Sequence, residues 1–458
     1  MASIYSSGLV IAAGTYDGVL AGWEFTEQTK PEIGSDVRPL TLSFATSVHE
    51  GSVRSLCMAG NVNKNEPGAL LSCGYDETLK THDWNKRQTS SGEVRTPAGF
   101  GTPICSAFAP PTGHSTHCVV GFSSDGKICI YKKRDWSVQH VLAGHDGGIG
   151  ALAVHPTGKL ALSGGIVDGK LKLWDLTKGR LSFVDKITPV STRGGRARYD
   201  SITSVIWSEG GDFYAFSHGT HVTVRDVATG KTLLDVEMPS RVNQVALMSG
   251  PEGLFVVAAC NDGSLPVLAV EDNEEESRKA IMAIEPVDSH LAREERFKCI
   301  QSVRDYYVVT ANSAGVVSLM NLQGAVNMMM SEPEDEDENS LPSDDESREQ
   351  DSDNENDTEL AVDIIESVRL GTGARITCLA AWAKSTESQI KEEAEQKEEK
   401  TTIKKKEKGP AEKHSTEKRK LDSKADEYMD ADAVKKARLL VKKAKKLKRK
   451  KAKKKIEN

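Results

Sequence analysis

A short apolar run that ends in a small residue, turns and restarts as a second apolar run occurs seven times along this chain of 458 residues. Apolar runs of this length separated by turn residues are typical of β-hairpins. The copies lie at 10–25, 69–84, 118–136, 154–175, 213–227, 254–270 and 306–322. A single hairpin cannot bury its own apolar face, so repeated units of this kind are expected to stack against one another.

The copy at 154–175 is the most complete. Gly144-His145 precede it, Asp168-Gly169 lie in its hairpin turn, and Trp174-Asp175 end it. A Gly-His and a Trp-Asp pair at this spacing indicate a WD repeat, which forms one four-stranded blade of a β-propeller. Unpaired buried polar groups are costly, so we predict that four side chains form a buried structural tetrad linked by hydrogen bonds: His145, Ser163, Asp168 and Trp174. Seven copies predict an all-β, seven-bladed WD-repeat β-propeller.

The ends of the repeat array predict how the ring closes. An inner strand precedes every hairpin except the first, and an unpartnered strand of the same type lies at 375–382. We expect this C-terminal strand to complete the first blade, so that no long sheet edge stays open. The closing residues are Ile376, Cys378, Leu379 and Trp382, and a connection of about 50 residues leads to them from the last hairpin. The propeller is therefore assigned to 1–384.

A formal charge of −7 hides a strong segregation of charge. Residues 331–359 carry fifteen carboxylates and one arginine, with almost no apolar residues between them. Such a segment cannot bury enough surface to fold, so a disordered acidic insertion is predicted. Ser331, Ser343 and Ser352 each have a carboxylate three residues further on, which makes them candidate phosphorylation sites for an acidophilic kinase. A solvated loop that is never phosphorylated is the alternative.

Residues 385–458 form a charged, lysine-rich tail, and 433–455 contain fourteen Lys or Arg and no acid. Good helix formers lie between these bases, so the tail is predicted to be partly helical and to gain helix when RNA phosphates relieve the charge repulsion. The RNA-binding candidates are Lys435, Lys436, Arg438, Lys442, Lys443, Lys445, Lys446, Lys448 and Arg449. Lys404–Lys406 and Lys418–Lys420 resemble nuclear-import clusters. A generic solubilising or nuclear-targeting tail is the alternative.

A second basic segment lies between two blades. Arg193, Arg196 and Arg198 flank two glycines and precede Tyr199, a combination that suits phosphate contact and base stacking. An ordinary surface loop is the alternative reading of this segment.

No motif indicates catalysis. The chain has no G-x-S-x-G, no P-loop and no metal-ligand spacing, so no catalytic residue, metal or cofactor is expected. Its eight cysteines include no C-x-x-C and fall mostly in strands, which favours buried free thiols. The apolar run near residue 10 is too short for a membrane span, so a soluble intracellular protein is expected.

Three stretches carry a resemblance to a known family: 155–163 continuing to Trp174, the opening 13–22, and the closing 374–382 before a lysine-rich tail. Together they resemble the PAK-interacting WD-repeat proteins, whose fungal relative is the maintenance-of-killer protein. The resemblance implies a nucleolar factor that assembles the large ribosomal subunit, a monomer within a larger particle whose partners are preribosomal proteins and rRNA. In animal relatives it implies an inhibitory contact with a p21-activated kinase.

Three classes of function follow from these features. The leading hypothesis is a non-catalytic scaffold in large-subunit (pre-60S) biogenesis, located in the nucleolus or nucleus, whose propeller docks protein or rRNA and whose tail contacts rRNA. A signalling adaptor that binds and inhibits a p21-activated kinase is the second. A histone or chromatin chaperone that uses the acidic insertion is the third, and an enzyme is the least favoured.

Overall fold

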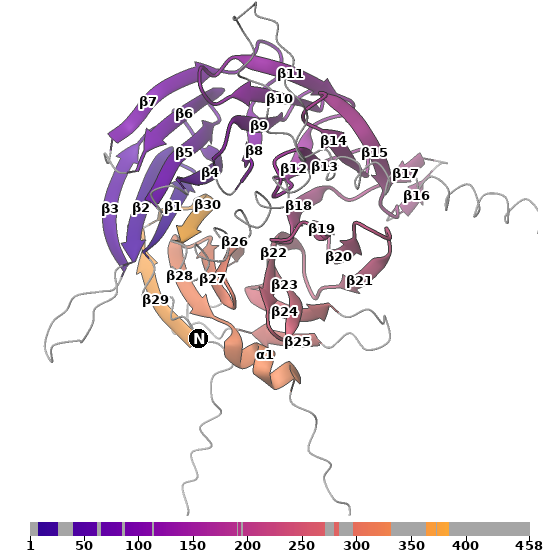
Figure 1. The fold of residues 1–458 in the computed structure, drawn as a ribbon. Helices are drawn as coiled ribbons and strands as arrows, with labels where there is room; N and C mark the ends of the chain where they lie inside the picture. The colour runs from indigo at the N-terminus through magenta and orange to yellow at the C-terminus, as the bar shows by residue number, and fades with distance from the viewer. Residues whose placement is uncertain are drawn as a thin grey trace, which may run out of the picture.

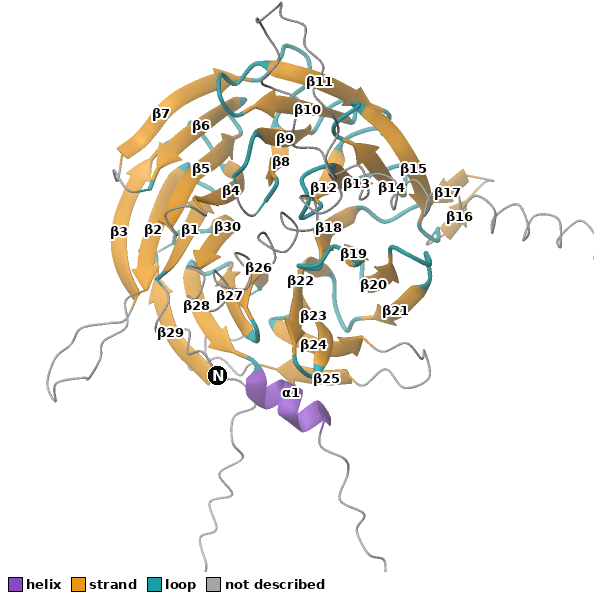
Figure 2. Ribbon diagram, viewed as in Figure 1, coloured by secondary structure: helices purple, strands orange, loops and turns teal. Residues whose placement is uncertain are grey.

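The computed structural model describes residues 8–25, 40–61, 66–84, 88–111, 114–189, 191–193, 196–270, 279–283, 296–330, 363–371 and 373–383. Seven four-stranded antiparallel sheets follow one another around a ring (Figure 1), and strands make up almost all of its regular structure (Figure 2). The predicted seven-bladed β-propeller is confirmed. The acidic insertion with its three serines, and the tail with its nine RNA-binding candidates, lie outside the described residues.

Each blade takes its strands in chain order from the centre of the ring to its rim, except that blade 1 receives its inner strand from the end of the chain. Blade 1 contains β30 (Ile376–Ala383), β1 (Leu9–Thr15), β2 (Val19–Phe25) and β3 (Leu40–Ser47). Blade 2 contains β4 (Val53–Asn61), β5 (Glu66–Gly74), β6 (Thr78–Asp83) and β7 (Gln88–Arg95). Blade 3 contains β8 (Pro103–Ala109), β9 (His117–Phe122), β10 (Lys127–Lys132) and β11 (Val138–Ala143). Blade 4 contains β12 (Ile149–Val154), β13 (Leu160–Gly165), β14 (Lys170–Asp175) and β15 (Arg180–Lys186).

The remaining three blades follow the same order. Blade 5 contains β18 (Ile202–Trp207), β19 (Phe213–His218), β20 (His221–Asp226) and β21 (Thr232–Glu237). Blade 6 contains β22 (Val242–Gly250), β23 (Gly253–Cys260), β24 (Ser264–Val270) and β25 (Lys279–Ala283). Blade 7 contains β26 (Phe297–Arg304), β27 (Tyr307–Asn312), β28 (Val316–Asn321) and β29 (Asp363–Arg369).

Antiparallel order gives the ring two different faces. The connections between blades and the turns between the second and third strands of each blade lie on one face, here called the upper face. The turns that join the first strand to the second, and the third to the fourth, lie on the other, the lower face. Each turn therefore belongs to one face because of its position in the blade.

The C-terminal strand closes the ring. β30 pairs antiparallel with β1 from Leu9↔Ala383 to Thr15↔Ile376, so the first and last described strands share one sheet. Its contacts reach both neighbouring blades: Gln301 of blade 7 bonds the backbone of Ala381 in both directions, at 3.1 and 2.8 Å, and the Thr377 hydroxyl donates to the Val53 carbonyl of blade 2 at 2.5 Å. Ile376 and Cys378 are buried, and Leu379 and Trp382 are partly buried against the adjoining cores.

The hydrophobic core is divided among the contacts between blades. One cluster joins blades 7 and 1 through Leu9, Ile11, Trp23 and Val309, and another joins blades 1 and 2. A strand that packs on both faces is apolar throughout, and β1 is accordingly buried at all seven positions. Stability is therefore spread around the ring, with each blade supported by its two neighbours.

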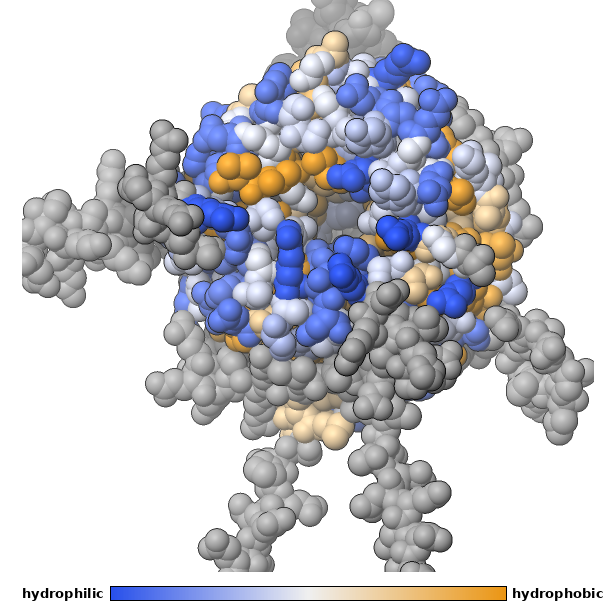
Figure 3. Space-filling model, turned by 180° about the vertical axis from the view of Figure 1, so that it is seen from behind, coloured by the Kyte–Doolittle hydropathy of each residue, from blue (hydrophilic) through white to orange (hydrophobic). Residues whose placement is uncertain are grey.

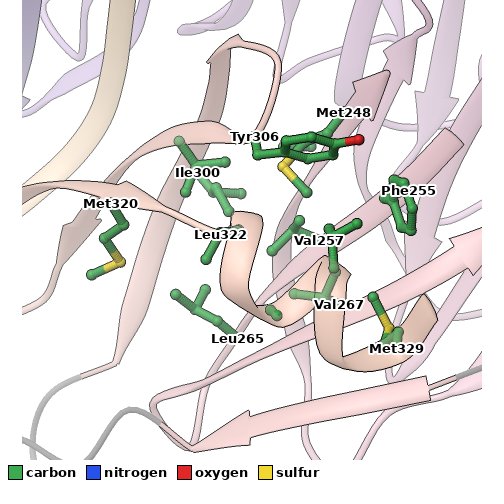
Figure 4. Close-up of a cluster of buried hydrophobic side chains, with 14 of the residues drawn as sticks. Met248, Phe255, Val257, Leu265, Val267, Ile300, Tyr306, Met320, Leu322 and Met329 are labelled. Atoms are coloured by element: carbon green, nitrogen blue, oxygen red, sulfur yellow. The ribbon is translucent and has the colours of Figure 1, made fainter. Parts of the chain in front are cut away.

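Two elements between β28 and the closing strand have no counterpart in the sequence analysis, which leaves this interval as one connection. α1 (Gln323–Met330) follows β28 directly, and the Asn321 side chain accepts a hydrogen bond from the Gln323 backbone at 3.1 Å. Ala325, Val326 and Met329 of α1 are buried against blades 6 and 7, where Figure 4 shows Met329 close to Val267. β29 then forms the outer strand of blade 7, so the connection needs to span only 331–362.

A small hairpin leaves the ring between blades 4 and 5. β16 (Ser191–Arg193) pairs with β17 (Arg196–Arg198), and Arg193 lies opposite Arg196. The segment predicted as an arginine-containing loop is therefore a two-stranded ribbon, and its register places positions 193, 196 and 198 on the same face of that ribbon.

Candidate functional site

The most polar buried cluster of blade 4 links two loops of the upper face. His145 lies in the connection from β11 to β12, and its Nδ1 is 3.0 Å from Asp168 Oδ2 in the β13–β14 turn. Its Nε2 is 2.7 Å from Ser163 Oγ, and the Trp174 indole N–H donates to that hydroxyl oxygen at 2.7 Å. The tautomer with its proton on Nδ1 donates to Asp168 and lets Nε2 accept from Ser163, so every polar side-chain group of the tetrad has a partner.

An aspartate, a histidine and a serine in this order are also the geometry of a hydrolase triad. Here the serine is fully buried, with 0% of its surface exposed, and its oxygen already accepts a hydrogen bond from Trp174. A nucleophile has to reach its substrate, so this geometry acts as a structural brace between strands and turns.

Charge in this brace is balanced locally. Burial alone raises the pKa of Asp168, but hydrogen bonds from His145 and from the backbone N–H groups of Lys170 and Asp146 outweigh burial and lower that pKa. Lys172 Nζ lies 3.8 Å from the same carboxylate, and burial lowers the lysine pKa. The turn is thus held by an ionised aspartate that accepts several N–H donors at once.

Blade 2 contains a second brace that the sequence analysis misses. His49 Nδ1 is 3.0 Å from Asp76 Oδ1, and His49 Nε2 is 2.8 Å from Ser72 Oγ. His82 Nε2 lies 2.8 Å from Ser72 Oγ, so His82 takes the place of the tryptophan as the third-strand partner of the hydroxyl. Burial, followed by the charges of His49 and Lys80, lowers the pKa of His82 to about 4, which keeps this ring neutral. Asp76 and His82 are six residues apart, as are Asp168 and Trp174, and this spacing is the signal in the sequence.

The strand registers identify the same two positions in other blades. In blade 7 Thr310 and Met320 occupy them, with the hydroxyl 3.9 Å from the sulfur. In blade 5 they are Phe216 and Arg225, whose guanidinium lies 5.4 Å from the ring centroid. In these blades the side chains at the positions equivalent to Ser163 and Trp174 remain in contact, although the residue types differ.

Blade 1 keeps the tryptophan but has no hydroxyl beside it. Ala13 and Trp23 stand at the positions of Ser163 and Trp174. Trp23 is 1% exposed, and its indole N–H finds no hydrogen-bond partner among the described residues. Blade 1 therefore contains an unsatisfied buried donor that a serine would pair with.

Three exposed side chains occupy equivalent turns of the upper face. Tyr16 in blade 1, Tyr75 in blade 2 and Val167 in blade 4 each lie between the second and third strands and are 61%, 63% and 64% exposed. Tyr75 directly precedes Asp76 of one brace, and Val167 directly precedes Asp168 of the other. The braces thus fix turns whose tips present apolar or aromatic groups to solvent. Figure 3 shows one face of the ring, with a hollow at its centre and hydrophobic residues gathered beside it.

The interblade hairpin lies in a connection of the upper face, and its neighbour Tyr199 packs close to Gly169 of the β13–β14 turn. Of the three predicted RNA-binding arginines of the interblade hairpin, the side chain of Arg198 is described, and it is exposed. All eight cysteines are free, and burial raises the pKa of Cys105 and Cys378 to about 12. In the part of the chain that the structure covers, no group of three or more His, Cys, Asp or Glu is placed to hold a metal ion, and no helix there has the length and apolarity to span a membrane.

Comparison with known proteins identifies a WD repeat and relatives that match most of the chain. Residues 136–175, which contain β11 to β14, match the family described as WD domain, G-beta repeat. A p21-activated protein kinase-interacting protein 1-like of Danio rerio is 25% identical over 87% of this chain and 87% of its own length. Shk1 kinase-binding protein 15 of Schizosaccharomyces pombe is 26% identical over 68% of this chain and 77% of its own. Telomerase Cajal body protein 1 of Bos taurus is 31% identical over 27% of this chain and 22% of its own.

The Danio rerio relative matches 87% of this chain, whereas the WD-repeat match covers only the outer strand of blade 3 and the first three strands of blade 4. The chain is therefore a WD-repeat β-propeller protein that is similar over most of its length to p21-activated protein kinase-interacting proteins.

Proposed function

We propose that this protein is a non-catalytic scaffold that docks a protein partner on its upper face and acts in assembly of the large ribosomal subunit. The observation that carries the docking surface is the placement of Tyr16, Tyr75 and Val167 at equivalent turns. Exposed aromatic side chains on a rigid support lose little conformational freedom on binding, which makes them suitable anchors for an interface.

The bracing networks support this role. His49 and His145 lie behind two of the three turns, each between an aspartate and a serine. Their rings are buried, at 4% and 5% exposure, so they act on a partner only through the turns that they hold. A surface whose geometry is fixed before binding loses less conformational entropy when the partner binds.

The assembly role is supported by the resemblance of the sequence to nucleolar assembly factors and by the tail, whose fourteen bases in 433–455 are suited to rRNA phosphate. The lysine-rich clusters support a nuclear location, as does the likeness of one segment to a protein named for the Cajal body. The tail would hold the protein near RNA while the ring engages protein.

The second candidate is binding of a p21-activated kinase, favoured by the names of relatives that match most of the chain. A kinase partner would use the same exposed turns, so the two candidates differ in the partner and not in the surface.

Sedimentation distinguishes these candidates. An assembly factor co-migrates with preribosomal large-subunit particles on a sucrose gradient, and releases from them when the particles are dissociated. A kinase adaptor stays at the top of the gradient and is captured by a purified p21-activated kinase. Absence from every preribosomal fraction, together with direct kinase capture, would replace the assembly role with the adaptor role.

The docking surface is tested separately with Tyr16→Ser, Tyr75→Ser and Val167→Ser combined in the full chain. We expect the affinity for the protein partner to fall tenfold or more. The melting temperature should stay unchanged, because exposed side chains contribute little to folding. Leu42→Ser, Val141→Ser and Leu181→Ser form the matched control, since these residues are exposed on outer strands of blades 1, 3 and 4. Equal loss in both variants would refute the upper-face assignment.

A further inference from the structure

Among the described residues, the lower face carries a basic sector in blades 3 and 4 and an acidic sector in blades 5 to 7. In blades 3 and 4 the lower-face turns and their bordering strand residues carry six Lys or Arg and two acids. The bases are Lys132, Lys133, Arg134, Lys159, Lys178 and Arg180, which together are called the basic sector. Lys132, Arg134, Lys178 and Arg180 are exposed. None of these residues contributes to the upper face.

The two acids of these turns are engaged by their own turns. Asp135 accepts hydrogen bonds from the Ser137 backbone at 3.0 Å and from its hydroxyl at 2.7 Å. Asp175 accepts from the Thr177 backbone at 3.1 Å and from the Lys178 backbone at 3.1 Å. Both carboxylates therefore accept hydrogen bonds within their own turns. The six bases outnumber the two acids by four, so the sector has an excess of four positive charges.

The turns of blades 3 and 4 form one continuous surface. A Cβ added to Gly179, in the β14–β15 turn, would lie 2.6 Å from the His140 ring of blade 3. A Cβ added to Gly158, in the β12–β13 turn, would lie 2.7 Å from the Pro110 backbone of blade 3. Such close approaches explain the glycines, and they place the bases of the two blades side by side, as the adjacent β10, β11, β14 and β15 in Figure 1 indicate.

Blades 5 to 7 present the opposite charge on the same face. Their described lower-face turns and bordering strand residues carry six acids and three bases: Glu209, Asp212, Asp226, Glu252, Asp305 and Asp363 against Lys231, Lys279 and Arg304. Burial and the charge of Asp305 raise the pKa of Glu209, and the charge of Arg304 opposes this rise. A flat anionic surface such as a membrane would meet both sectors at once, whereas a narrow polyanion can follow the basic sector alone.

We propose that the basic sector of blades 3 and 4 binds the phosphate backbone of RNA. The choice of RNA as the polyanion rests on the proposed role in ribosomal-subunit assembly. Exposed Lys and Arg on rigid turns contact phosphates without reading bases, so the sector positions RNA on the ring and the acidic sector keeps the strand from crossing it. The RNA site of the propeller is therefore on the face opposite the protein-docking turns.

The test uses the full chain, a fluorescent 20-nucleotide oligouridine and anisotropy across salt concentration. The variant combines Lys132→Gln, Arg134→Gln, Lys178→Gln and Arg180→Gln. If each base meets one phosphate, the slope of log affinity against log salt falls in magnitude by about 3, and affinity at low salt falls tenfold or more. The matched control removes four exposed upper-face bases with Arg95→Gln, Lys186→Gln, Arg241→Gln and Arg296→Gln.

A change in slope confined to the lower-face variant supports the proposal. Equal slopes in the two variants, or loss of binding to an oligoaspartate peptide without loss of RNA binding, would overturn it. Sedimentation of the unsubstituted chain separates this outcome from the proposed function. If the unsubstituted chain co-migrates with preribosomes but the two variants have equal RNA slopes, only the basic sector is disproved. If the unsubstituted chain never co-migrates, the assembly role is disproved whatever the RNA slopes.

Discussion

Removing a hydroxyl from blade 4 should lower the stability of the protein, and adding one at the equivalent position of blade 1 should raise it. Ser163→Ala removes the oxygen that Trp174 donates to and the hydroxyl that His145 accepts from, at 2.7 Å each. Ala13→Ser adds a hydroxyl at the equivalent position beside Trp23, whose buried N–H lacks a partner among the described residues. The two substitutions are therefore inverse experiments on one structural motif.

The magnitudes follow from the cost of unpaired buried groups. Each such group costs about 1 to 3 kcal/mol, so Ser163→Ala, which leaves two, should lower the free energy of unfolding by about 2 to 6 kcal/mol. Ala13→Ser pairs one donor but also buries a hydroxyl whose own proton needs an acceptor, so its gain should be about 1 kcal/mol. Ala13 is 0% exposed, so solvent does not supply the hydrogen bond in the parent protein.

The assay is urea unfolding followed by tryptophan fluorescence, with the free energy of unfolding extrapolated to zero denaturant. Ala12→Ser is the control, because Ala12 is equally buried and alternates to the other face of β1, which packs on blade 2. We expect Ala12→Ser to destabilise the protein, since it adds a buried hydroxyl without reaching Trp23. If Ala13→Ser destabilises as much as Ala12→Ser, the equivalence drawn between the blades is wrong.

Three further outcomes follow from the structure. The folded state holds His82 neutral, with a pKa of about 4 against an ordinary 6.5. The neutral ring therefore contributes fully to the free energy of unfolding above pH 6.5, and about 3 kcal/mol of that contribution is lost as the pH falls toward 4. Urea unfolding across this pH range should show a smaller fall in the free energy of unfolding for His82→Gln than for the parent protein. Truncation before Arg375 removes β30 and exposes the inner edge of blade 1, so the shortened chain should aggregate or lose its cooperative melt in calorimetry, whereas a soluble, cooperative 1–370 fragment would contradict the closure. Deletion of 331–359 shortens the connection between α1 and β29, so the melting temperature should stay level or rise slightly, and a fall of many degrees would mean that the segment packs on the ring.

The blades were predictable because the same order of apolar runs and turn residues recurs seven times, once with the Gly-His and Trp-Asp pairs of a WD repeat. Ring closure was predictable for a related reason: one strand was missing at the start of the array, and one of the same type was left over at its end. Gly-His and Trp-Asp pairs specified the brace of blade 4 before any coordinates, including all four of its residues.

The elements that escaped prediction have weaker or altered signals. α1 has only eight residues, and its buried stripe of Ala325, Val326 and Met329 lies beside a run of methionines with no charged residue to mark a helical face. β29 follows a long acidic stretch and has alternating partial exposure, so its sequence resembles a loop. The blade 2 brace was missed because His82 replaces tryptophan, although its spacing from Asp76 is preserved. Charge sectors on the lower face need the ring itself, because their residues come from turns of different blades.

The most direct test of the scaffold's role is a map of crosslinks between this protein and RNA, obtained from intact cells for the full chain. We expect crosslinks to precursor rRNA of the large subunit from two parts of the protein, the tail at 433–455 and the basic sector of blades 3 and 4. Protein crosslinks from the same sample should instead come from the turns of Tyr16, Tyr75 and Val167. A map with kinase crosslinks at those turns and no precursor rRNA at either basic region would contradict the assembly role.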